Sequence, residues 1–182
     1  LFEGLLNGRP AKDAPWITAR ICGVCPIAHN LASLKAVEAA FGIIPNRTTI
    51  LLRKLMMASQ IIQSHTLHLF FLALPDYLGL DSGLELAKKK PEFFKIAVNL
   101  KEIGDQISQI VAGRGIHPTT TTIGGFHKIP DKKILKDLSL KLDKNFNFAV
   151  ASAEAFSRLH YPQYNIEIEF ISQTNKKDYP DY

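Results

Sequence analysis

The chain has 182 residues, of which 46% are apolar and 21% charged, and its formal net charge is +5. This length is enough for one domain with a hydrophobic core, and the composition is that of an ordinary globular protein. The basic residues form no stripe interleaved with aromatic residues, so a nucleic-acid partner is not expected. Two cysteines are too few for a disulfide scaffold and favour a reducing compartment such as the cytoplasm.

The first half of the chain is predicted to be mostly helical after an irregular start. Glycine and proline interrupt residues 1–20, which should be largely loop with one short helix or strand. A helix is expected over residues 27–41, with Pro26 at its first position and an end at Gly42. A second helix should begin at Asn46, a good N-cap, and run to about residue 74, where Pro75 ends it.

The second half continues this pattern. A helix from about residue 91 to Gly113 is indicated by apolar residues at spacings of three and four. Residues 113–130 combine glycines with four threonines and predict a short hairpin or ordered loop. A fourth helix should cover residues 131–160, and the alternation over 166–170 predicts an edge strand, before a loose polar tail after Ser172. The fold class is therefore mainly α, a buried helical bundle with a small β hairpin or loop region, in one domain over residues 1–182.

The periodicity also predicts which side chains face inward. The second helix should bury Leu51, Leu55, Ala58, Ile62, Leu69 and Leu72; the third Phe93, Ile96, Leu100, Ile103, Ile107 and Ile110; the fourth Leu135, Leu138, Leu142, Phe146, Ala149, Ala153 and Phe156.

Residues 55–75 lack charged side chains over a length that could cross a bilayer. Serine, glutamine, threonine and histidine interrupt this stretch, and each polar group would need a partner in lipid. A buried helix is therefore expected rather than a membrane span. On it, His65 and His68 share a face and could ligate a metal, but buried, hydrogen-bonded core histidines are the favoured interpretation.

The chemistry is concentrated in the segment 20–29. Cys22 and Cys25 are three positions apart and can chelate one soft metal ion. We place Cys25 at a helix N-terminus, where the helix dipole is expected to lower the pKa of its thiol. His29 lies one turn further on the same face, within reach of a metal-bound sulfur.

The two cysteines alone leave three interpretations open. A thioredoxin-like dithiol has the same local sequence, but that fold needs alternating strands and helices. A structural zinc site needs four ligands, and the chain has no second cysteine pair. A soft transition-metal centre could be completed by residues outside this chain.

The pattern Arg20-x-Cys22-Gly23-x-Cys25-x-x-x-His29 resembles the N-terminal cysteine motif of nickel–iron hydrogenase large subunits. Further segments resemble the family in the same order, over roughly residues 1–160. They are Phe2-Glu3-Gly4-Leu5-Leu6-Asn7-Gly8-Arg9, Ser64-His65-x-x-His68-Leu69-Phe70-Phe71-x-x-Leu74-Pro75-Asp76, and Gly113-Arg114-x-Ile116-His117-Pro118 followed by Gly124-Gly125-Phe126. The similarity is greatest to the cytosolic, bidirectional branch, whose acceptors are NAD(P) or a deazaflavin. The related quinone-reducing subunit of respiratory complex I lacks the cysteines.

The resemblance implies a role for each matching residue. Cys22 would be a terminal nickel thiolate, Cys25 would bridge nickel and iron, and His29 would hydrogen-bond near the bridging sulfur. Glu3 aligns with a carboxylate that binds magnesium. In the family, iron also carries carbon monoxide and cyanide, and hydrogen is split heterolytically between the metals and a thiolate base. The implied partners are an iron–sulfur small subunit and diaphorase-type electron-transfer subunits.

Two parts of the family pattern are missing. The family needs a second cysteine pair, in an Asp-Pro-Cys-x-x-Cys motif, and a proton-gate glutamate upstream of Glu3, and this chain has neither. We therefore expect the N-terminal part of a longer subunit, a partial domain that cannot assemble the centre alone. The alternative is a non-catalytic helical remnant or partner-binding scaffold that holds a zinc ion or keeps a dithiol.

Overall fold

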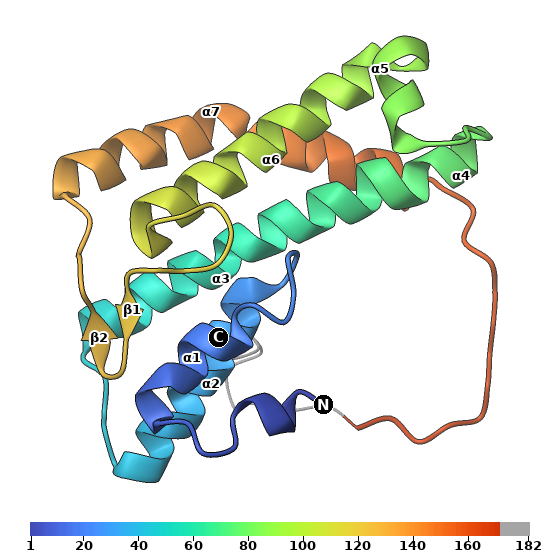
Figure 1. Ribbon diagram of the computed structural model, residues 1–182. Helices are drawn as coiled ribbons and strands as arrows, with labels where there is room; N and C mark the ends of the chain where they lie inside the picture. The colour runs from blue at the N-terminus through green and yellow to red at the C-terminus, as the bar shows by residue number, and fades with distance from the viewer. Residues whose placement is uncertain (172–182) are drawn as a thin grey trace.

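The computed structural model describes residues 1–171, which are mainly helical with one two-stranded antiparallel hairpin (Figure 1). The elements, in chain order, are η1 (Glu3–Leu5), η2 (Ala11–Asp13), α1 (Ala14–Thr18), α2 (Pro26–Phe41), α3 (Arg47–Leu67), η3 (His68–Ala73), α4 (Leu74–Leu78), η4 (Gly83–Glu85), α5 (Leu86–Lys89), α6 (Pro91–Ala112), β1 (Thr121–Thr122), β2 (Gly125–Phe126) and α7 (Lys132–Ser157). The predicted class, mainly α with a small hairpin, is confirmed.

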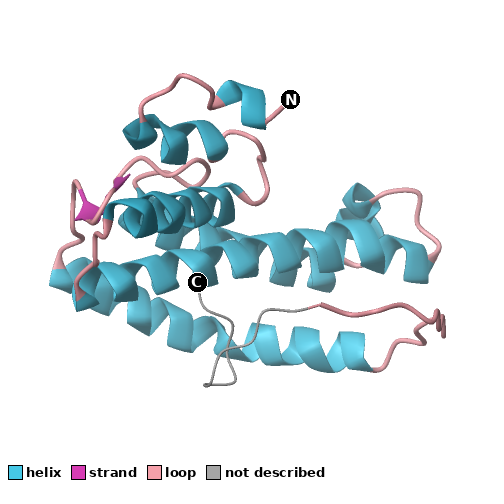
Figure 2. Ribbon diagram, turned by 90° about the horizontal axis from the view of Figure 1, so that it is seen from below, coloured by secondary structure: helices cyan, strands magenta, loops and turns pink. Residues whose placement is uncertain are grey.

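The long helices α3 and α6 lie side by side and form the centre of the structure (Figures 1 and 2). Gly104 allows their close approach, because a Cβ atom there would lie 2.7 Å from Gln63 Cγ and 3.2 Å from the Ser59 carbonyl oxygen. Helix α7 packs against α6, and the short α1 packs against α2, which in turn contacts α3. The start of α2, which follows the cysteine segment, lies beside the middle of α3, where Gln60 bonds to the Ile27 and Ala28 N–H groups.

The buried side chains form two clusters along this frame. The larger one joins α2, α3, α6 and α7 and consists of Ile27, Leu31, Leu34, Leu52, Met56, Ile103, Ile107, Val111, Ala112 and Leu138. The smaller one lies around Phe70, whose ring meets that of Phe156 edge-on at 5.5 Å between centroids. The larger cluster is the one beneath α2, so it supports the helix that follows the two cysteines.

The helix ends follow the signals in the sequence. Pro26 is the first residue of α2, and the helix ends at Gly42 in the left-handed conformation, with φ +65°. Helix α6 ends in the same way at Gly113, with φ +81°. The side chain of Asn46 accepts a hydrogen bond from the Thr49 amide at the start of α3, as expected of an N-cap.

The prediction that Pro75 ends the second helix is wrong. The chain remains helical through the π-helical turn η3 into α4, and Pro75 lies in the first turn of α4. A proline is tolerated there because its missing N–H would have no partner in a first turn. The left-handed Gly79 ends the helical run instead.

The predicted inward faces are correct for α6 but partly wrong for its neighbours. In the predicted stripe, Leu51 on α3 and Leu72 on η3 are 55% and 63% exposed, and Ala58 on α3 is exposed too. The buried face of α3 instead carries polar side chains among its apolar ones, namely Ser59, Gln60, Gln63 and Thr66. His65 and His68, predicted to be buried, are both exposed. Helical period alone does not decide which side of a helix its neighbours cover.

Helix α7 is covered over only part of its length. Leu138 and Phe156 are buried as predicted, whereas Phe146, Ala149 and Ala153 are exposed. These three side chains line an apolar cavity of about 400 Å³ between α3, α6 and α7. The middle of α7 therefore lines a hollow instead of a packed core.

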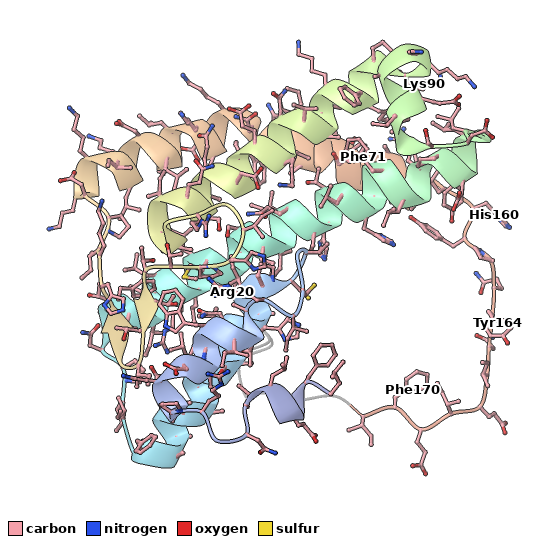
Figure 3. All side chains as sticks on the ribbon, in the orientation of Figure 1. Arg20, Phe71, Lys90, His160, Tyr164 and Phe170 are labelled. Carbon is pink, nitrogen blue, oxygen red and sulfur yellow. The ribbon has the colours of Figure 1, made fainter. Side chains whose placement is uncertain are left out.

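The predicted edge strand over residues 166–170 is wrong. This segment has no regular structure, its side chains are exposed, and it stands away from the helices, as Tyr164 and Phe170 show in Figure 3. A strand needs a neighbour to bond its backbone, and no strand among residues 1–171 lies beside it. The tail predicted after Ser172 lies outside the described residues. Within residues 1–171, no helix combines the length and apolar character needed to cross a membrane.

Candidate metal centre

The two cysteines lie in the turn that joins α1 to α2. Cys25 is the N-cap of α2, and its backbone N–H donates a hydrogen bond to Cys22 Sγ at 3.1 Å. Neither cysteine is in a disulfide, and both are half-buried. The tight turn between them therefore holds two thiols on one side of the helix N-terminus.

His29 completes a three-residue cluster. Because it follows Cys25 by four positions on α2, its ring lies one turn above the N-cap. One ring nitrogen of His29 and the sulfur atoms of Cys22 and Cys25 all lie within 4.8 Å of one another. The structure thus brings together three of the four predicted site residues. The fourth, Glu3, lies on η1 with an exposed side chain and is not part of this cluster.

The two thiols differ in acidity because they share a hydrogen bond. The bond from the Cys25 thiol, followed by the backbone N–H of Cys25, lowers the pKa of Cys22. The same thiol–thiol bond, together with burial, raises the pKa of Cys25. The predicted lowering of the pKa of Cys25 by the helix dipole is therefore wrong, since its role as donor to Cys22 outweighs its place at the helix N-terminus.

Helix α1 and the turn after α6 hold one side of this cluster. The Thr18 hydroxyl lies 3.2 Å from the His29 carbonyl oxygen, and Asn30 Nδ2 donates to the Pro15 carbonyl at 3.0 Å.

In the turn after α6, His117 Nδ1 lies 2.9 Å from the Ala19 carbonyl oxygen. His117 has φ +58°, so its backbone is in the left-handed region, and its ring connects a distant turn to the segment just before Cys22. His117 therefore has a structural role, in a turn that supports the cysteine segment.

Helix α3 holds the other side through a residue that sequence reasoning missed. Gln60 is 7% exposed, and its Oε1 accepts hydrogen bonds from the backbone N–H groups of Ile27 at 2.7 Å and Ala28 at 3.0 Å. These are the donors that follow Cys25 at the start of α2. The signal was present, because a glutamine in an apolar helix needs a buried partner, but its partner lies more than thirty residues away in the sequence.

The donor set suits a soft or borderline metal ion. Two sulfurs and one imidazole nitrogen are ligands for nickel, zinc or iron, and hard cations that require oxygen donors are disfavoured. The side chain of Cys25 makes no capping hydrogen bond to its own helix. Three converging donors leave coordination positions for ligands from elsewhere, so these residues fit a thiolate-bound nickel centre completed by another part of a protein.

Comparison with known proteins identifies the family. The model for "Nickel-dependent hydrogenase" matches residues 1–102, the part of the chain that contains the cysteine turn and α3. The chain belongs to this hydrogenase family. It is 35% identical over 158 residues to the sulfhydrogenase 1 subunit alpha of Pyrococcus furiosus, covering 87% of this chain and 37% of that relative. It is 38% identical over 138 residues to the sulfhydrogenase 2 subunit alpha of the same organism, covering 76% of this chain and 34% of that relative.

The fold is also that of a hydrogenase. A solved NAD+-reducing [NiFe]-hydrogenase in the H2-reduced state superposes with a TM-score of 0.82 at 31% identity. The alignment covers 86% of this chain and 37% of that chain. The hydrogenase chain described here thus spans little more than a third of the length of these relatives.

Proposed function

We propose that this chain forms the N-terminal part of the catalytic large subunit of a hydrogenase, which interconverts dihydrogen with protons and electrons at a nickel–iron centre. The convergence of Cys22, Cys25 and His29 within 4.8 Å is the observation that carries this proposal. Family membership supports it, because a nickel-dependent hydrogenase requires thiolate ligands and these are the two cysteines of the chain.

We assign a different task to each of the three residues. Cys22 would be a terminal ligand of nickel, and its lowered pKa means that this sulfur loses its proton first and is ready to bind a metal. Cys25 would bridge nickel and iron. His29 would donate a hydrogen bond near the bridging sulfur, since its ring lies within 4.8 Å of both sulfurs. When bound, the centre supplies heterolytic cleavage of dihydrogen, with carbon monoxide and cyanide as further ligands of its iron.

The remaining assignments extend beyond the cysteine turn. Glu3 would contribute a hard carboxylate oxygen to a magnesium ion, the donor type which that ion prefers. Residues 1–182 would be one part of a single larger domain, and the rest of the subunit would supply the second cysteine pair.

The partners follow from the same two thiolates. Both cysteines are used at the centre, so electrons would leave through the iron–sulfur clusters of a small subunit. Similarity to an NAD+-reducing hydrogenase supports diaphorase-type partners and the bidirectional branch. The free state of both thiols supports a cytoplasmic location.

The donor set can be tested on the chain itself. We expect purified protein to bind Ni2+ with a sulfur-to-metal charge-transfer band, and Cys22→Ser and Cys25→Ser each to remove most of that band. His29→Ala should weaken binding, whereas His127→Ala, which changes an exposed histidine outside the cluster, should not. Nickel binding that survives loss of both thiols would overturn the proposal. Retention of zinc in place of nickel would favour the non-catalytic scaffold.

Activity needs a second test, because the centre requires four thiolates. The chain can be combined with a segment of a relative that carries the Asp-Pro-Cys-x-x-Cys motif. After the metal centre has been inserted, this combination should exchange hydrogen isotopes, and the same combination with the Cys22→Ser variant should not. The chain alone is expected to show neither stoichiometric nickel–iron incorporation nor hydrogen uptake. Uptake by the chain alone would contradict the expectation that it provides only part of the centre.

A further inference from the structure

The N-terminus of α2 has an unusual hydrogen-bond arrangement. An N-cap side chain ordinarily accepts a bond from the backbone N–H of the second or third residue of its helix. Cys25 is the N-cap here, yet its side chain makes no such bond. The N–H groups of Ile27 and Ala28, the second and third residues of α2, both donate to Gln60 Oε1 from the neighbouring helix.

We propose that Gln60 is a positioning residue for the metal centre: by capping α2 from α3, it keeps the Cys25 sulfur free of hydrogen bonds from the Ile27 and Ala28 N–H groups and available to metals. This inference rests on the proposed function, because it concerns the availability of a metal-binding sulfur. It assigns Gln60 no contact with substrate or with the reacting atoms.

The geometry leaves little freedom for another arrangement. Pro26 has no N–H, so Ile27 and Ala28 carry the first backbone donors of α2 after its N-cap. Two donors converge on one atom, which must therefore be the carbonyl oxygen of the glutamine side chain. Its Nε2 lies 3.9 Å from Met57 Sδ, on the same helix. Gln60 is buried, so water cannot readily replace it as the acceptor.

Loss of the Gln60 acceptor would change the hydrogen bonding of the Cys25 sulfur. With Gln60→Met, the two N–H groups would be left buried without their partner, and Cys25 Sγ is the side-chain acceptor that an N-cap normally offers them. A thiolate that accepts backbone hydrogen bonds has less electron density to donate to a metal. Contacts of this kind around metal ligands typically alter affinity by about 10–100-fold.

The chain offers a matched control on the same helix. Gln63 is also 7% exposed, and its Nε2 donates to the Gly104 carbonyl at 3.1 Å, away from α2. Gln63→Met removes the same buried amide from α3 without affecting the start of α2. Gln60→Glu keeps an acceptor oxygen at the original position and serves as the conservative variant.

Titration of the purified chain with Co2+ tests the proposal, because the cobalt–thiolate charge-transfer band reports directly on the sulfur. We expect Gln60→Met to weaken Co2+ binding about tenfold or more and to shift the band to higher energy. Gln63→Met and Gln60→Glu should leave both quantities near those of the unmodified chain. Equal effects of Gln60→Met and Gln63→Met, or no shift of the band in Gln60→Met, would overturn the proposal.

A further readout separates this proposal from the proposed function. If the unmodified chain shows no cobalt–thiolate band, the metal site itself fails. Alkylation at a pH where both thiols are ionised then decides the role of Gln60. Slower alkylation of Cys25 in Gln60→Met than in the unmodified chain, with the rate at Cys22 unchanged, would support the proposed role of Gln60. Equal alkylation rates of Cys25 in the variant and the unmodified chain would overturn it.

Discussion

A buried ion pair links α2, α3 and the hairpin and provides the sharpest test of the packing. Arg53 is fully buried, and its two terminal nitrogens donate to the two carboxylate oxygens of Glu38 in a bidentate pair. Glu38 also accepts the Gly124 backbone N–H at 2.7 Å, and Arg53 reaches the Thr122 carbonyl at 3.3 Å. One pair of charges thus holds three elements that are far apart in the sequence.

Glu38→Gln is expected to lower the free energy of unfolding by about 3–5 kcal/mol, because it leaves the guanidinium charge buried without its counter-charge. Arginine cannot lose its proton to escape this cost. Small domains are stable by only about 5–15 kcal/mol, so the loss would remove a large part of the total. Urea denaturation followed by circular dichroism measures this loss of stability. The slope of the unfolding free energy against urea concentration should stay unchanged.

Two control variants test whether the buried charge causes the loss of stability in Glu38→Gln. Replacing both partners, Glu38→Met with Arg53→Met, should restore much of the loss, because no buried charge remains. Glu85→Gln, which breaks the exposed pair with Lys89, should cause no measurable change. A loss below about 1 kcal/mol in Glu38→Gln would mean that the pair contributes no more than an exposed one, and burial would then not be the source of its effect on stability.

Other predictions concern packing, capping and thiol chemistry. Gly104→Ala should destabilise the fold by about 1–3 kcal/mol in urea denaturation, because the added Cβ meets a neighbouring helix at 2.7 Å. Asn46→Ala should remove the cap of α3 and lower the unfolding free energy by about 1 kcal/mol. The lowered pKa of Cys22 means that its thiolate forms at lower pH, so mass spectrometry should detect alkylation of Cys22 at a lower pH than that of Cys25.

Each of these predictions has a contrary outcome. Gly4→Ala introduces a Cβ into open space and is the control for Gly104→Ala, so equal effects of the two would exclude close helix packing as the cause. If the free energy of unfolding of Asn46→Ala is unchanged, water replaces the Asn46 side chain as the cap of α3. Cys25→Ala should move the alkylation onset of Cys22 to higher pH, since it removes the thiol that lowers the pKa. An unchanged onset would contradict that cause.

The sequence by itself determined the parts of this protein that depend on neighbours along the chain. Proline and glycine signals correctly predicted the first residue of α2 and the ends of α2 and α6. The spacing of Cys25 and His29 placed these two donors on one face at the start of α2, because positions four apart share a face, and Cys22, three positions before Cys25, joins them in one cluster. Such signals can be read from the sequence because each depends on the conformation of only a few consecutive residues.

Only the tertiary structure decided what depends on residues distant in the sequence. It showed that the hydrogen bond between the thiols raises the pKa of Cys25, that Gln60 caps α2 from another helix, and that the polar side of α3 is buried. It also showed that residues 166–170 have no neighbouring strand within the described chain. A helix or strand pattern specifies a local conformation, but burial and hydrogen-bond partners depend on which elements meet in space, and that information is spread over the whole chain.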